Sequence, residues 1–111
     1  MRAGRLDRLI DIEEPIETRT DSGDVSVTWE KVATVWASIE FDSGGETDSG
    51  SGELARSNEI FRIRWRRGLT AKHRIAWRPE KTAEKRYYDI RSITEIGRRE
   101  GFVITASAKV P

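Results

Sequence analysis

The sequence predicts an all-β fold, a small antiparallel β-barrel of six or seven strands of the SH3-like kind. Apolar residues recur at every second position along most of the chain, and no segment keeps a helical apolar stripe over ten residues. Hydrophobic residues make up 36% of the chain and charged residues 35%, so the interior must be small. Strands of a small barrel bury only one face, which suits this composition. With 111 residues, the chain is expected to form a single domain over residues 1–111.

The N-terminal half contains three segments with strand character. The first, RLDRLIDIEE, has alternating apolar residues and is expected to end at Pro15. A turn, TDSGD, then precedes a strand in which Val25, Val27 and Trp29 share one face. The segment TVWASIEF is rich in β-branched and aromatic residues and is expected to stop at Asp42.

The C-terminal half is predicted to add four more strands. EIFRIRWRR and HRIAWR are joined by the turn RGLTAK, a charged connector leads into YYDIRSITEI, and the turn GRREG precedes FVITASAKV. The pattern does not decide which faces Trp29 and Trp36 occupy. The expected core consists of Ile10, Ile12, Val35, Ala37, Ile39, Phe61, Ile63, Trp65, Ile75, Trp77, Tyr88, Ile90, Phe102 and Ile104.

One segment lacks strand character. DSGGETDSGSGELARSNE is rich in glycine, serine and acids, so it cannot bury enough apolar area to offset its ordering entropy. We expect residues 42–57 to form a long flexible loop with at most one helical turn. Loops of this length inside a compact domain are usually functional or disordered.

The charges are segregated along the chain. Residues 40–59 hold six acids and one base, whereas residues 60–78 hold seven bases and no acid. These two poles can pair within the molecule, or they can meet different neighbours, as subunits stacked head to tail would do.

Composition excludes several classes of protein. The net charge of +1 argues against a dedicated nucleic-acid binder, which usually carries a basic excess. The chain has no cysteine, so it can form neither a disulfide nor a thiolate site. No apolar run is long enough to span a bilayer, and the first residues lack the pattern of a signal peptide. A soluble protein made in the cytoplasm is expected.

Catalysis is not predicted. His73 is the only histidine, and it lies in a turn with no partner that the sequence ties to it. Glu13 and Glu14 are expected at a strand end rather than in a cleft. The segment GSGELA matches a loose dinucleotide fingerprint but has no surrounding βαβ unit. No metal-ligand spacing is present, so neither an enzyme nor a cofactor is expected.

The segment IFRIRWRRGLTAKHRIAWR leaves two interpretations open. Arg62, Arg64 and Arg66 alternate with apolar residues, so they are expected to project together from one face of a strand. Such a row can bind phosphates and would make a small nucleic-acid-binding barrel. It can equally be a solvated or subunit-contacting face, since the same alternation turns Trp65 inward and away from any base.

The order of these segments resembles the phage head–tail joining family, also called head-closure, stopper or head-completion proteins. Its most specific part is IRWR with the following GLT, then Arg74-Ile75 and YDI at residues 88–90. VWA at residues 35–37, with Ser43-Gly44 shortly after it, adds to the match. The resemblance spans nearly the whole chain, although the segment at 46–55 is thinner and more acidic than in relatives.

The resemblance implies a structural virion protein of a tailed phage or prophage, with no catalysis and no cofactor. It implies a homo-oligomeric ring at the head–tail interface, dodecameric in the virion. The ionic surface gives no hydrophobic drive to self-association, so the isolated chain is expected to be monomeric. Such a ring binds the portal or adaptor on the head side and a tail or tail-terminator protein on the other. It closes the DNA-filled head, genomic DNA only passes through its lumen, and no membrane is involved. In this interpretation the subunit or partner contacts are Arg62, Arg64, Arg66 and Arg67, and the channel-facing loop contains Asp42, Gly44, Gly45, Glu46, Asp48 and Glu53.

Overall fold

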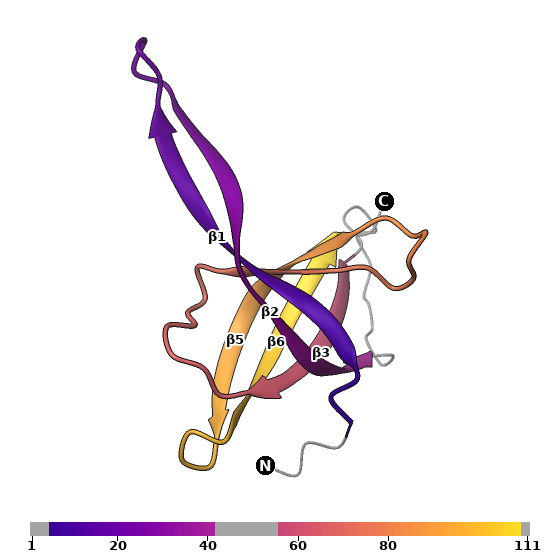
Figure 1. Ribbon diagram of the computed structural model, residues 1–111. Helices are drawn as coiled ribbons and strands as arrows, with labels where there is room; N and C mark the ends of the chain where they lie inside the picture. The colour runs from indigo at the N-terminus through magenta and orange to yellow at the C-terminus, as the bar shows by residue number, and fades with distance from the viewer. Residues whose placement is uncertain (1–4, 42–55, 110–111) are drawn as a thin grey trace, which may run out of the picture.

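The computed structural model describes residues 5–41 and 56–109 and forms one closed antiparallel β-barrel there. The strand order around the barrel is β1-β2-β3-β6-β5-β4 (Figure 1). The predicted all-β barrel is therefore confirmed, with six strands in the described residues. These strands are β1 (Arg8–Arg19), β2 (Val25–Phe41), β3 (Arg56–Arg64), β4 (Arg74–Trp77), β5 (Arg86–Ile96) and β6 (Gly101–Lys109).

The core fills the barrel with residues from all six strands. Phe61 is fully buried, and its ring meets that of Tyr88 edge to face at a centroid distance of 5.1 Å. Most of the predicted core is confirmed, but Val35, Ile39 and Trp65 are only partly buried against it. The prediction missed Ala76, Ala106 and Ala108, which are buried although alanine carries little apolar signal of its own.

Two strands are longer than the sequence pattern indicated. The two segments expected within residues 25–41 form one continuous strand of 17 residues, β2. The expected stop at Pro15 is wrong, because β1 continues through it to Arg19. Beyond Glu13 the barrel strand β4 no longer pairs with β1, so Pro15 has a neighbour on one side only. A proline is tolerated in such an edge segment because its missing N–H need not break a second ladder.

The outer halves of β1 and β2 leave the barrel as a two-stranded projection, here called the arm, which comprises residues 14–30 (Figure 1). A register shift between Ile12 and Glu13 marks the point of departure. A turn over residues 20–24, here called the tip, joins the two strands. In this turn the Thr20 amide donates to the Asp24 carbonyl at 2.8 Å, and Gly23 adopts a φ of 92° that disfavours other residues.

The predicted loop at 42–57 is partly corrected. β3 already begins at Arg56, because residues 56 and 57 pair with Lys109 and Ala108 of β6. Residues 42–55 lie outside the described part of the chain. They include every predicted channel-facing residue, namely Asp42, Gly44, Gly45, Glu46, Asp48 and Glu53.

Tyr88 gives the core a dependence on alkaline pH. Burial raises the pKa of its hydroxyl above the ordinary value of 10.0, and the negative charge of Glu59 adds to this against the opposing effect of Arg86. A raised pKa means that the stabilisation is complete below the unfolded value and is lost as pH rises through the folded value. Tyr88→Phe should therefore lose less stability than the wild type as the pH rises from about 9 to 11. Urea unfolding across that range measures both slopes, and equal slopes would contradict the expectation.

Candidate partner-binding surfaces

The predicted row of arginines is divided between two places. Arg62 and Arg64 belong to β3, but Arg62 is already engaged, since its Nη1 donates to Glu40 Oε1 at 2.8 Å. Arg64 is exposed, and no acid among the described residues pairs with it. Of the two, Arg64 is therefore the side chain available to a partner.

Arg66 does not continue the row of Arg62 and Arg64, which corrects the sequence prediction. β3 ends at Arg64, and the chain then turns through Gly68, whose φ is 88°. Arg66 lines a pocket, and the Arg67 guanidinium lies 5.9 Å from the centre of the Trp65 ring. The alternation that fixes side-chain direction in a strand holds only while the ladder continues, so it gives no direction beyond Arg64.

Trp65 closes one end of the barrel. It is half-buried, with its ring stacked on Phe102 at a centroid distance of 6.3 Å. The guanidinium groups of Arg67 and Arg99 lie over this ring, that of Arg99 at 5.0 Å. Trp65 is therefore partly covered by its own chain, and its ring is not presented for stacking on bases.

A mixed apolar and cationic surface lies on the outside of β1, β2 and β3. Leu9 and Trp36 are paired across β1 and β2, and both are exposed, Trp36 by 53%. Ala37 of β2 pairs with Ile63 of β3. The next residues along these antiparallel strands, Trp36 and Arg64, therefore lie at the same level on the outer face. Tryptophan and arginine are enriched at protein interfaces, especially among residues that contribute most to binding. The sequence left the face of Trp36 open, and the structure places it outside.

The root of the arm is held by Arg74 of β4. Its guanidinium lies 4.3 Å from the centre of the Trp29 ring and 4.1 Å from that of Tyr87. Its Nε also donates to Glu13 Oε1 at 2.7 Å, and Glu13 is only 8% exposed. The expectation that Glu13 lies at a strand end is wrong, because β1 continues to Arg19 and Glu13 is buried within it. Its partner is 61 residues away, so no local pattern indicated the pair.

A second tether joins β1 to the connector between β4 and β5. Asp11 accepts hydrogen bonds from Thr34 Oγ1 at 2.7 Å and from Lys85 Nζ at 3.2 Å. Burial alone would raise the pKa of Asp11, but these two hydrogen bonds and the charge of Lys85 outweigh it and lower the pKa. The outer face of β1 is therefore fixed on both sides next to the arm.

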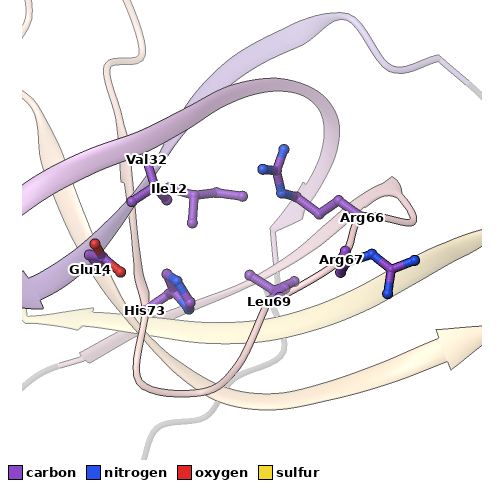
Figure 2. Close-up of a pocket in the computed structure, with 8 residues that line it drawn as sticks. Ile12, Glu14, Val32, Arg66, Arg67, Leu69 and His73 are labelled. Atoms are coloured by element: carbon purple, nitrogen blue, oxygen red, sulfur yellow. The ribbon is translucent and has the colours of Figure 1, made fainter.

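A small pocket of about 180 Å³ lies where the arm meets the barrel (Figure 2). Its lining residues come from β1, β2 and the turn between β3 and β4, which we call the root turn (residues 66–73). The pocket combines apolar side chains with the cationic group of Arg66, and His73 beside it is bonded through Nδ1 to Thr70 of the same turn. The lining consists of Ile12, Glu14, Val32, Arg66, Arg67, Gly68, Leu69 and His73.

The described residues contain no metal-binding cluster and no membrane-spanning helix. Within residues 5–41 and 56–109, no three His, Asp or Glu side chains are grouped so that they could hold a metal ion. The same residues contain no helix long and apolar enough to cross a bilayer. The candidate surfaces are the Trp36–Arg64 face, the arm and the pocket at the root of the arm, here called the root pocket.

The described residues define a small closed β-barrel protein with exposed apolar and charged surfaces. Comparison with protein families makes this specific: the chain belongs to the phage head completion protein family, whose model matches residues 1–109. This is a family of structural virion proteins and not of enzymes, so the chain is a virion component. The resemblance seen in the sequence is confirmed.

Solved structures agree with the fold. Protein SF1141 from Shigella flexneri 2a is 29% identical, with a TM-score of 0.72, and the match covers 97% of this chain and 96% of that one. A chain from the virion of a native gene transfer agent particle is 23% identical, with a TM-score of 0.70 and 96% coverage of both chains. A search of curated proteins found no match.

Proposed function

We propose that this protein assembles as a ring beneath the portal or its adaptor, closes the DNA-filled head and offers a docking surface to the tail or tail terminator. The observation that carries the proposal is the match to the head completion family over residues 1–109. The similarity in fold to a chain of a gene transfer agent virion supports it, because that protein also belongs to a particle.

The surface of the barrel supports protein contact, and not DNA binding, as the main role of the row Arg62, Arg64 and Arg66. Arg64 lies at the level of the exposed Trp36, and Arg62 is paired with Glu40, so the face is a mixture of apolar, cationic and neutralised groups. Phosphate binding favours several unpaired bases along one track, since each contact adds salt-dependent affinity. Binding of DNA through Arg62, Arg64 and Arg66 is the second candidate function, and the local excess of bases in residues 60–78 favours it.

The decisive experiment is addition of the purified chain to DNA-filled heads that lack it, followed by sedimentation and infectivity assays. The wild-type chain should join these heads and keep their DNA inside. A parallel titration against duplex DNA should show weak binding with a shallow dependence on salt. Failure to join heads, together with a steep linear loss of DNA affinity in log salt, would favour the nucleic-acid-binding module instead.

Reversing two cationic side chains should separate folding from joining. Arg64→Glu/Arg66→Glu should leave the barrel folded, because neither side chain pairs with an acid in the described residues. Addition to DNA-filled heads should fall by about tenfold or more, because like charges that face each other across an interface disfavour binding. The heads should then leak DNA. Lys81→Glu/Arg98→Glu makes the same charge change at exposed positions elsewhere and serves as the control. Normal joining by the Arg64/Arg66 variant would remove both the Trp36–Arg64 face and the Arg66 side of the root pocket from the interface.

A further inference from the structure

The arm is acidic and most of it is solvent-exposed. Residues 14–30 contain five acids and one base, a net charge of −4, and the tip contributes Asp21 and Asp24 with no base. Both aspartates are exposed, as is Val25 next to the tip. Within the described residues, neither aspartate forms an ion pair. An exposed two-stranded projection of this kind is only marginally stable by itself, so it benefits from a partner.

The turn at the root of the arm is basic, in contrast to the acidic arm. The root turn carries Arg66, Arg67 and Lys72 and no acid. Arg66 and Arg67 border the pocket together with one acid, Glu14, and its apolar side is formed by Ile12, Val32 and Leu69 (Figure 2). This combination fits a short segment that offers carboxylates together with a small apolar side chain. The tip, with its two aspartates followed by Val25, has this chemistry.

The tip and the root pocket of one molecule do not meet. The strands of the arm pair continuously from Glu13–Lys31 to Arg19–Val25, which is seven residue pairs. At roughly 3.3 Å of rise per residue, this ladder holds the tip about 20 Å from the root. Figure 1 shows the arm extending away from the barrel, and the contacts of Arg74 with Trp29 and Glu13 fix its base. The complementary surfaces can therefore meet only between two copies.

We propose that the tip of one copy binds the root pocket of the next copy, with Asp21 and Asp24 facing Arg66 and Lys72. Each chain then carries a donor surface and an acceptor surface at different places, so the contact can repeat head to tail as a heterologous contact. Heterologous contacts generate a ring whenever the rotation between neighbours closes. This inference rests on the proposed function, and it names the contact that sets the order and direction of subunits in the ring.

The proposed contact is small and ionic, so two isolated copies should associate only weakly. Complementary charges at an interface fix register and orientation more than they raise affinity. One tip bound in one pocket gives only weak association between two copies. When the ring closes on a head, further contacts are added, and these hold the ring together. The isolated chain is therefore monomeric, and the tip–root contacts form when copies gather on the head.

A charge-reversal experiment with rescue tests the pairing. Asp21→Lys/Asp24→Lys and Arg66→Glu/Lys72→Glu should each reduce addition to DNA-filled heads by about tenfold or more. The chain carrying all four changes should recover joining, because the attraction is restored with opposite sign. Lys81→Glu/Arg98→Glu should join normally, and thermal melts check that every variant folds. Absence of recovery in the combined variant would overturn the proposal.

Site-directed cross-linking separates this proposal from the proposed function. The chain has no cysteine, so Ser22→Cys/Ala71→Cys introduces the only two thiols at exposed positions and keeps all four charges of the proposed contact. On heads, a short bis-maleimide should yield a ladder of species larger than dimers, since a head-to-tail contact repeats whereas an isologous contact stops at the dimer. A chain that joins heads without a ladder, or whose tip cross-links to another virion protein, overturns the tip–root contact alone. A chain that never joins heads overturns the proposed function.

Discussion

Phe61→Ala is expected to lower the free energy of unfolding by about 3 to 5 kcal/mol, which is the range for removing a large buried aromatic side chain. Phe61 is fully buried, and its ring contacts that of Tyr88 edge to face. The strand that carries it pairs with β2 on one side and β6 on the other, so the cavity would open between three strands. Hydrogen-bonded neighbours on both sides limit how far the barrel can collapse into the space. Urea unfolding at neutral pH measures the loss.

Trp36→Ala is the matched control for this change. It deletes a larger aromatic side chain from the outer face, where Trp36 is 53% exposed, so the free energy of unfolding should change by about 1 kcal/mol or less. The variant should instead weaken addition to DNA-filled heads, because Trp36 belongs to the proposed contact face. Equal destabilisation by the two substitutions would mean that the inside and the outside of the sheet are assigned the wrong way round.

The sequence predicted the barrel and most of its core because the two-residue alternation of apolar and polar side chains indicates both the strands and their buried faces. Alternation of Phe61 and Ile63 with Arg62 and Arg64 tells which face is buried, and it holds for as long as the ladder continues. Trp65 fits the same alternation but lies just beyond the end of β3, so it is half-buried at the barrel end. Strand endings were therefore the weakest part of the prediction.

The arm could not be predicted from the sequence pattern. Val25, Val27 and Trp29 alternate in the same way as core residues, yet all three are exposed. What distinguishes them is the extent of pairing with the next strand: β4 is short and pairs with β1 only from Asp11 to Glu13. Pairing between distant strands is a property of the tertiary fold, and no feature of residues 14–30 encodes it.

The positions of the candidate contact residues were predicted in part, and their contact with a partner stays a prediction. The family resemblance and the excess of bases predicted contact residues within residues 62–67, and Arg64 is exposed on an outer face. Arg62 was expected in the same role, but it is paired with Glu40 across β2 and β3. The root pocket was missed because it combines Ile12 and Val32 with the root turn, which is more than thirty residues away in sequence.

Arg74→Met is the second change with a large expected effect. It removes the partner of Glu13, whose side chain is only 11% exposed, and leaves a carboxylate buried without compensation. It also removes the cation from between Trp29 and Tyr87. The free energy of unfolding should fall by about 2 to 4 kcal/mol, somewhat less than for a fully buried pair because Arg74 retains some solvent. Urea unfolding measures this, and the indole N–H resonance of Trp29 should shift as the root of the arm loosens.

Glu13→Gln in the Arg74→Met background separates the two contributions. Removing the buried charge should restore about half of the lost stability, because a neutral amide costs less to bury than an unpaired carboxylate. The Trp29 resonance should stay displaced, since the cation over its ring is still missing. Loosening the root lets the arm swing, so both variants should join DNA-filled heads less well than the wild type even where the barrel is folded. If the double variant regains full stability, the native Trp29 resonance and normal joining, then Arg74 acts only by neutralising Glu13 and does not set the direction of the arm.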